Sequence, residues 1–177
     1  YTLNAKIAGA VNTIKVENGT LYGENTDGIG LVNDLCNNLQ QSIKGKDILI
    51  LGAGGTTQGI LLPFLECQPE RILLANRTKA KSLKLASKYS EYGKVCGFGL
   101  DQIKAKPVDI IINATSASMD GKIPEIPSGV AAGALCYDLM YGRQTPFMQW
   151  ARENSALEVT DGLGMLVEQA ASAFAFW

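Results

Sequence analysis

The sequence contains no histidine. This absence excludes Ser-His-Asp hydrolysis, zinc sites of the H-E-x-x-H type and any proton relay through imidazole. An acid or a base in this protein must therefore be a lysine, an aspartate, a glutamate, a tyrosine or a cysteine. The four cysteines are far apart and form no C-x-x-C pair, so we interpret them as reduced thiols rather than as disulfides or metal ligands.

Long apolar runs and an excess of one charge are missing as well. No stretch approaches the roughly 20 apolar residues that cross a bilayer, and no basic segment leads into an apolar one as in a secretory signal, so we expect a cytoplasmic protein. The 16 basic and 17 acidic residues leave a net charge of −1, and the basic residues are dispersed. This pattern disfavours nucleic acid and membrane surfaces as partners and favours a small molecule.

Apolar strands, glycine turns and helices alternate from residue 46 onward, beginning with DILILGAGG and RILLAN. Such alternation predicts an α/β fold with a doubly wound parallel sheet of the Rossmann type. Ahead of it, residues 10–24 alternate around Asn18-Gly19, a strong hairpin signal. A helix is expected over residues 28–40, with Asp27 as its N-cap. The first residues of the chain look strand-like.

The segment ILILGAGGTTQG (residues 48–59) joins the first of these strands to a helix. Glycines at 52, 54 and 55, with Ala53 between them, permit a tight turn and close approach to a pyrophosphate at the helix N-terminus. Thr57 stands where the third glycine of a strict G-x-G-x-x-G motif would be. By itself this segment fits a packing turn as well as a cofactor loop.

The end of the second strand decides between these readings. An acidic residue there would bind the ribose of NAD, whereas the sequence places Asn76, Arg77 and Thr78, followed by Lys81, at this point. A guanidinium can hold a phosphate with two hydrogen bonds and stack on adenine. Positive charge is also unfavourable at a helix start unless an anion is bound. The sequence therefore predicts NADP as the cofactor.

Seven motifs in register resemble the shikimate dehydrogenase family, and the similarity extends over essentially the whole chain. The motifs are GAVNT (9–13), ENTDGIG (24–30), GAGGTTQG (52–59), NRTKAK (76–81), INATSASM (112–119), YDLMYGRQTPF (137–147) and DGLGMLVEQAA (161–171). The resemblance implies NADPH-dependent reduction of 3-dehydroshikimate to shikimate, a step of chorismate and aromatic amino-acid biosynthesis. It also implies a substrate domain and a Rossmann-type NADP domain.

The resemblance also implies roles for individual residues. Asn12, Asp27 and Gln169 match substrate-binding positions, and Asp27 matches the partner of a catalytic lysine. The positions that match the cofactor site are Gly52, Ala53, Gly54, Gly55, Asn76, Arg77, Thr78, Lys81, Thr115, Ser116, Met140, Tyr141, Gly162 and Met165. The family often has arginine where this chain has Lys81. From the residues alone, Asp27 would be a helix cap, Asn12 a turn residue and Gln169 a tolerated polar residue.

The catalytic lysine of the family is not among these motifs, and we expect it in a segment ahead of Tyr1. We therefore expect a fragment that binds NADP without turnover. The expected units are residues 1–26 as a substrate-domain remnant carrying the β-hairpin, 27–45 as a connecting helix and linker, 46–160 as the NADP-binding Rossmann domain, and 161–177 as a helix returning to the substrate domain. The apolar end leaves two partners open, a further part of the protein or a second copy in a homodimer.

Three other functions remain as alternatives. An NAD-dependent quinate/shikimate dehydrogenase would commonly have Asp on the Thr78–Lys81 side of the phosphate site. A non-catalytic module that senses dinucleotides would need none of Asn12, Asp27 and Gln169. A purely structural α/β domain would leave Arg77 and its basic neighbours without a purpose.

Overall fold

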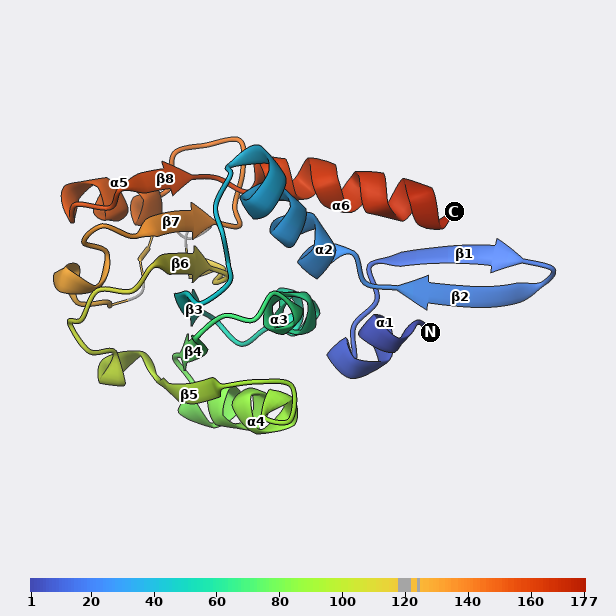
Figure 1. Cartoon of the computed structure of the whole chain (residues 1–177), viewed down its shortest axis with the longest axis horizontal. Helices are drawn as coiled ribbons and strands as arrows, with labels where there is room; N and C mark the ends of the chain where they lie inside the picture. The colour runs from blue at the N-terminus through green and yellow to red at the C-terminus, as the bar shows by residue number, and fades with distance from the viewer. Residues whose placement is uncertain (118–121, 124) are drawn as a thin grey trace.

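The apolar runs form one parallel sheet in the computed structural model, which describes residues 1–117, 122–123 and 125–177. Helices cover both faces of this sheet, and a separate hairpin extends away from it (Figure 1). The strands of the sheet are β3 (Asp47–Leu51), β4 (Arg71–Asn76), β5 (Val95–Gly99), β6 (Ile110–Asn113), β7 (Leu135–Asp138) and β8 (Glu158–Thr160). The predicted Rossmann-type α/β fold is thus confirmed.

The strands lie in the order β5-β4-β3-β6-β7-β8, and every pair is parallel. This is the 3-2-1-4-5-6 order of a doubly wound nucleotide-binding sheet. The order reverses between β3 and β6, and ligands bind such sheets outside the carboxyl ends of the strands at that point. The topology therefore places any site beside the residues that follow β3, β4 and β6.

Each face of the sheet has its own apolar core, because successive side chains of a strand point to opposite faces. Ile48 and Ile50 face one core, which also holds Tyr137 and side chains of the helices that flank that face. Leu49 and Leu51 face the other core with Phe147. The helices are α1 (Leu3–Ala8), α2 (Asp27–Asn33), α3 (Gly55–Glu66), α4 (Lys79–Tyr89), α5 (Pro146–Glu153) and α6 (Leu163–Phe176), with the π-helix η1 (Asp34–Asn38) and the 3-10 turns η2 (Leu100–Gln102) and η4 (Ser128–Val130).

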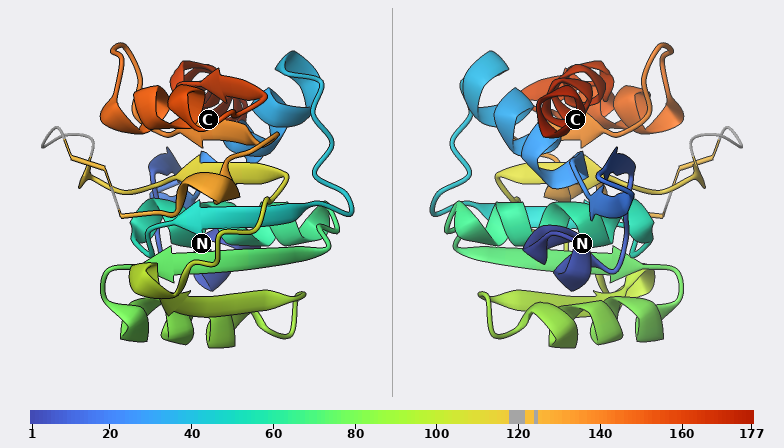
Figure 2. Two further views of the ribbon diagram at one scale, coloured as in Figure 1. Left: turned by 90° about the vertical axis from the view of Figure 1, so that its left-hand side faces the viewer. Right: turned by 90° about the vertical axis from the view of Figure 1, so that its right-hand side faces the viewer.

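The hairpin consists of β1 (Thr13–Glu17) and β2 (Thr20–Glu24), joined by the predicted turn. Asn18 and Gly19 have φ angles of 50° and 74°, the left-handed values that a two-residue hairpin loop requires. The right-hand view of Figure 2 looks onto the end of the molecule where the hairpin and both chain ends lie. Within the described residues, no helix is both long and apolar enough to span a bilayer.

Two local expectations are wrong. The first residues of the chain form helix α1 rather than a strand: the Thr2 hydroxyl accepts a hydrogen bond from Ala5 N at 3.2 Å, and Gly9 ends the helix at a φ of 69°. Asp27 is the first residue of α2 rather than its N-cap, which is Thr26, and the expected single helix becomes π-helical from Asp34 onward. The Asp27 carboxylate is consequently available for other contacts.

Candidate functional site

Two adjoining cavities lie at the carboxyl ends of the strands, with volumes of about 750 Å³ and about 310 Å³. They share Ala114, Thr115 and Ser116, which follow β6 at the point where the strand order reverses. The larger cavity lies toward β4 and the smaller one toward α2 and α6. A ligand that occupies both would cross the sheet edge at β6.

The turn after β3 forms one wall of the larger cavity. Gly52 has a φ of 109°, and a Cβ there would meet Ala114 O at 2.9 Å, so only glycine fits. A Cβ at Gly54 or Gly55 would meet nothing within 4 Å, which leaves the turn open to a ligand. Thr57, in place of the third glycine, donates a hydrogen bond to Gly52 O at 3.2 Å and thereby braces the turn.

Helix α3 begins at this turn with uncapped amides. Gln58 N donates to Gly54 O, so the amides of the residues before Gln58 have no partner within the helix. Gly54, at the N-cap position, offers no side chain to them. A row of free N–H groups at the positive end of a helix is a binding site for anionic groups.

Basic side chains lie at the other end of the larger cavity, where β4 ends. Arg77 and Lys81 line it, and neither forms an ion pair within the described chain. Asn76 donates a side-chain hydrogen bond to Thr78 O at 2.9 Å, which fixes the turn that carries Arg77. The larger cavity therefore joins free helix amides at one end to two unpaired cations at the other.

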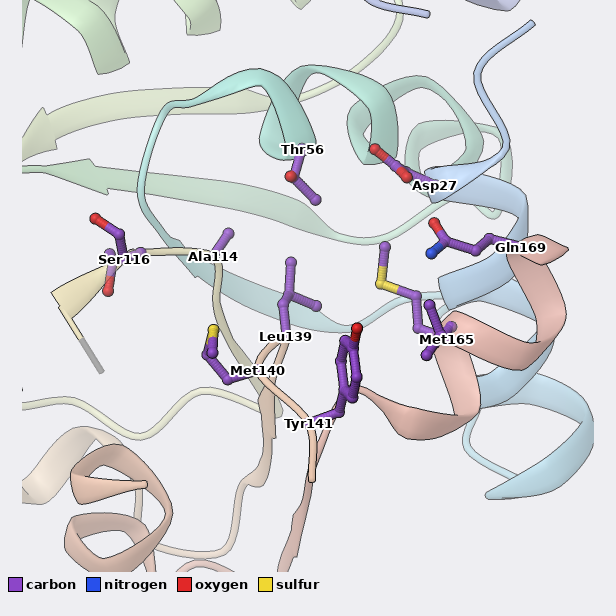
Figure 3. Close-up of a pocket in the computed structure, with 12 residues that line it drawn as sticks. Asp27, Thr56, Ala114, Ser116, Leu139, Met140, Tyr141, Met165 and Gln169 are labelled. Atoms are coloured by element: carbon purple, nitrogen blue, oxygen red, sulfur yellow. The ribbon is translucent and has the colours of Figure 1, made fainter. Parts of the chain in front are cut away.

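The smaller cavity is formed mainly by the second half of the chain (Figure 3). Asp27 at the start of α2 and Gln169 on α6 come from neighbouring helices and line its far end, with Met165 beside them. Met140 and Tyr141 follow β7, and the Tyr141 side chain is half exposed. The cavity thus combines a carboxylate and an amide with an apolar wall.

Asp27 is held by Asn12, which donates a hydrogen bond from Nδ2 to Asp27 Oδ1 at 2.7 Å. Asn12 Oδ1 in turn accepts hydrogen bonds from the backbone N and the hydroxyl of Thr26. Burial raises the pKa of Asp27, and the hydrogen bond from Asn12 lowers it in part. Asn12 does not line the cavity itself and acts on the site through this contact.

The raised pKa predicts how stability depends on pH. Because the folded-state pKa of Asp27 lies above its unfolded value of 3.8, the folded state loses stability as pH rises through this window. Asp27→Asn should therefore raise the free energy of unfolding slightly at pH 7, by less than about 1 kcal/mol after solvent screening, and not at pH 3. Thermal unfolding at both pH values measures this difference, with the exposed Glu91→Gln as control. An equal gain at both pH values would contradict the assignment.

A buried polar network shapes the loops that line both cavities. Asp138, fully buried at the end of β7, accepts hydrogen bonds from Asn113 Nδ2 at 3.2 Å, Thr145 Oγ1 at 2.5 Å and Met140 N at 3.1 Å. Asn113 Oδ1 accepts from the backbone N and the hydroxyl of Thr115. The network therefore connects the loops that follow β6 and β7.

Most of the residues that the sequence analysis singled out line one of the two cavities. Gly55, Thr78 and Asn12 line neither cavity. Gly55 and Thr78 directly follow residues that line the larger one, and Asn12 is hydrogen-bonded to Asp27, which lines the smaller one. The lining residues that the sequence did not predict are Thr56, Leu100, Asp101, Ala114, Ala117, Lys122, Ile123, Glu125, Leu139 and Leu166. Asp101 lies just after the carboxyl end of β5. The strand pattern could therefore have predicted that Asp101 lines the cavity. Residues 118–119 of the INATSASM motif lie outside the described residues.

The fold and the two cavities define a Rossmann-type α/β protein whose site lies at the reversal of the strand order. Comparisons with known proteins agree with this class. Residues 34–120 match the family model "Shikimate / quinate 5-dehydrogenase". A shikimate dehydrogenase (NADP(+)) of Ruthia magnifica subsp. Calyptogena magnifica is 65% identical over 176 residues, which cover 99% of this chain and 66% of the relative.

Two solved structures are also similar to the chain. An Ael1 enzyme from Pseudomonas putida has a TM-score of 0.93 and 41% identity, covering 99% of this chain and 65% of the other. A shikimate dehydrogenase in complex with NADP+ has a TM-score of 0.85 and 35% identity, covering 99% and 63%. The chain belongs to the shikimate dehydrogenase family. It spans just under two thirds of the length of these relatives.

Proposed function

We propose that the protein binds NADP(H) and serves the reduction of 3-dehydroshikimate to shikimate, in the biosynthesis of chorismate and the aromatic amino acids. One observation carries this proposal: a single cavity is lined by the glycine turn after β3 and by Arg77 and Lys81 after β4. An NADP molecule has a pyrophosphate and a 2′-phosphate on the two sides of one ribose, and the cavity offers a group for each.

The described residues fit this cofactor. The free amides at the start of α3 would hold the pyrophosphate, and the open space at Gly54 and Gly55 leaves room for it. Arg77, assisted by Lys81, would bind the 2′-phosphate, since both are free of carboxylate partners in the described chain. Asp101 and Glu125 line the same cavity, and their carboxylates would repel a phosphate group placed next to them.

The smaller cavity would receive the nicotinamide and the substrate. Met140, Tyr141, Gly162 and Met165 would surround the ring, which lets the cavity wall exclude water from it. When bound, NADPH supplies a hydride for the carbonyl carbon of the substrate. Asp27, oriented by Asn12, and Gln169 would bind the substrate hydroxyl groups.

The same arrangement supports the division of the chain into units, as a proposal. Residues 1–26 contain the hairpin, which forms a sheet of its own, and residues 46–160 contain all strands of the parallel sheet. Residues 27–45 and 161–177 carry α2 and α6, which pack against each other and bring Asp27 and Gln169 to the cavity. Both helices would thus join the two units at the site.

Isothermal titration calorimetry of the chain with NADPH and NADH tests the cofactor proposal. We expect NADPH to bind more tightly by a factor of about 10 or more, because only NADPH has a phosphate for Arg77. Equal affinities would refute the 2′-phosphate site. Tighter binding of NADH would favour an NAD-dependent quinate/shikimate dehydrogenase.

A turnover assay addresses the reaction. Among the described residues, no lysine lines the smaller cavity with Asp27. The 177 residues alone should therefore reduce no NADP+ when shikimate is added, although they bind the cofactor. Measurable turnover by this chain would show that a group other than the expected lysine exchanges the proton with the substrate.

A further inference from the structure

A buried hydrogen-bonded pair lies behind the smaller cavity. The Tyr137 hydroxyl on β7 donates to Asp34 Oδ2 at 2.6 Å and accepts from Met165 N at 3.1 Å. Tyr137 is 0% exposed and Asp34 is 4% exposed, and neither side chain lines either of the two cavities described above. The pair connects the sheet, the π-helix η1 and the first turn of α6.

The first turn of α6 depends on this hydroxyl. Gly162, at the N-cap position, has no side chain to satisfy the amides of that turn. Asp161 Oδ1 accepts a hydrogen bond from Leu163 N at 3.2 Å, and Tyr137 supplies the acceptor for Met165 N. A strand on the sheet therefore caps the helix with a tyrosine, and Asp34 places negative charge at the positive end of that helix.

The surroundings of Asp34 are adapted to this contact. A Cβ at Gly164 would lie 2.0 Å from Asp34 Oδ1, so the glycine lets the carboxylate approach the helix. Asn38, four residues along η1, donates to Asp34 Oδ1 at 2.8 Å and to Glu168 Oε1 at 3.1 Å. The π-helical turn thus directs two side chains at α6, and such turns are frequent at functional sites.

Burial, the hydrogen bond to Asp34 and the nearby charge together raise the pKa of Tyr137 despite the bond from Met165 N. The hydroxyl consequently stays protonated near neutral pH and can donate to Asp34 and accept from Met165 N at the same time.

We infer that Tyr137 and Asp34 are positioning residues that hold the first turn of α6, and with it Gly162 and Met165, against the nicotinamide half of the dinucleotide. This inference rests on the proposed function. The inference follows from the partners of these hydrogen bonds. The Tyr137 hydroxyl accepts a hydrogen bond from the backbone amide of Met165, and Met165 lines the smaller cavity. The larger cavity, with Arg77, has no contact with this pair.

The test compares two ligands on the chain itself. NADPH contains the nicotinamide, whereas 2′-phospho-ADP-ribose lacks it and retains the groups for the larger cavity. Tyr137→Phe should weaken NADPH binding by about 5- to 10-fold, the scale of one lost hydrogen bond, and leave 2′-phospho-ADP-ribose within about 2-fold. It should also speed amide hydrogen exchange at Met165.

Tyr89→Phe is the matched control. Tyr89 is equally buried, and its hydroxyl lies 2.8 Å from Gln58 O on α3 and 3.4 Å from Ile7 O on α1, so its hydrogen bonds go to these two helices rather than to α6. This variant should lose comparable stability without changing the ratio of the two affinities. If Tyr137→Phe does not fold, Asp34→Asn, which keeps the shape and removes the charge, should shift the ratio in the same direction by a smaller factor.

The possible results separate the two claims. If the ratio and the exchange rate at Met165 stay at wild-type values in the folded variants, or if both ligands weaken equally, the positioning role is wrong. If the wild-type chain binds neither ligand, the proposed function is wrong and the inference fails with it.

Discussion

Replacing Arg77 by alanine should remove most of the preference for NADPH over NADH. The guanidinium lines the larger cavity and has no carboxylate partner in the described chain. Hydrogen bonds to a 2′-phosphate would therefore form without breaking an ion pair of Arg77. A charge-assisted pair of this kind contributes about 1.5–3 kcal/mol, which corresponds to roughly 10- to 150-fold in affinity. NADH, without the phosphate, should bind the variant as well as the wild type.

The control for this experiment is Lys79→Ala. Lys79 is a cation two residues from Arg77, but it does not line the cavity. If long-range attraction of the phosphate by net positive charge were responsible, both variants would lose similar affinity, and raising the salt concentration would remove the difference from wild type. Our assignment requires calorimetry to show a much larger loss for Arg77→Ala than for Lys79→Ala. An intermediate loss is expected for Lys81→Ala, because an ammonium binds phosphate as a point charge.

The sequence predicted the sheet, and it predicted that the residues after β3 and β4 lie close together, for a physical reason. Strands such as the one that ends in Asn76 are buried on both faces and appear as continuous apolar runs. Since the strands are parallel, the residues just after them meet at one edge of the sheet, so Gly52 and Arg77 come together although 25 residues separate them. No knowledge of distant contacts was needed for that.

The errors came from parts that depend on packing or on caps. The first residues of the chain look strand-like, although Thr2 and Gly9 are a normal N-cap and C-cap for the six-residue helix α1. The sequence indicates Asp27 as an N-cap because aspartate commonly fills that position. In the structure, Asn12 reaches its carboxylate from 15 residues away, a contact that local pattern cannot reveal.

The cavity lining was predicted least well after β6. Lys122, Ile123 and Glu125 come from a segment with neither helical nor strand periodicity, so the sequence gives no sign of the direction of their side chains. The π-helix at Asp34 was equally hidden. Its side chains contact Tyr137 and α6, which lie more than 100 residues further along the chain.

The contact between α2 and α6 leads to the largest expected effect on stability. A Cβ at Gly30 would lie 2.7 Å from both the Cβ and the backbone N of Gln169, and 2.9 Å from its Cα. These atoms belong to a helix backbone, which cannot move aside as a flexible side chain can. Gly30→Ala should therefore lower the free energy of unfolding by about 2–3 kcal/mol, despite a gain in helix propensity of about 1 kcal/mol. For a chain of this length that is a fall in melting temperature of roughly 4–12 °C.

Gly55→Ala separates this clash from a general effect of replacing glycine in a helix. Gly55 is also helical, but a Cβ there would meet nothing within 4 Å, so Gly55→Ala should leave the free energy of unfolding unchanged or raise it by up to about 1 kcal/mol. Thermal and urea unfolding of both variants measure the difference. A Gly30→Ala variant as stable as Gly55→Ala would mean that α2 and α6 can separate at little cost. Asp27 and Gln169 could then move relative to each other, and the close helix contact would no longer explain how the two side chains are held at one cavity.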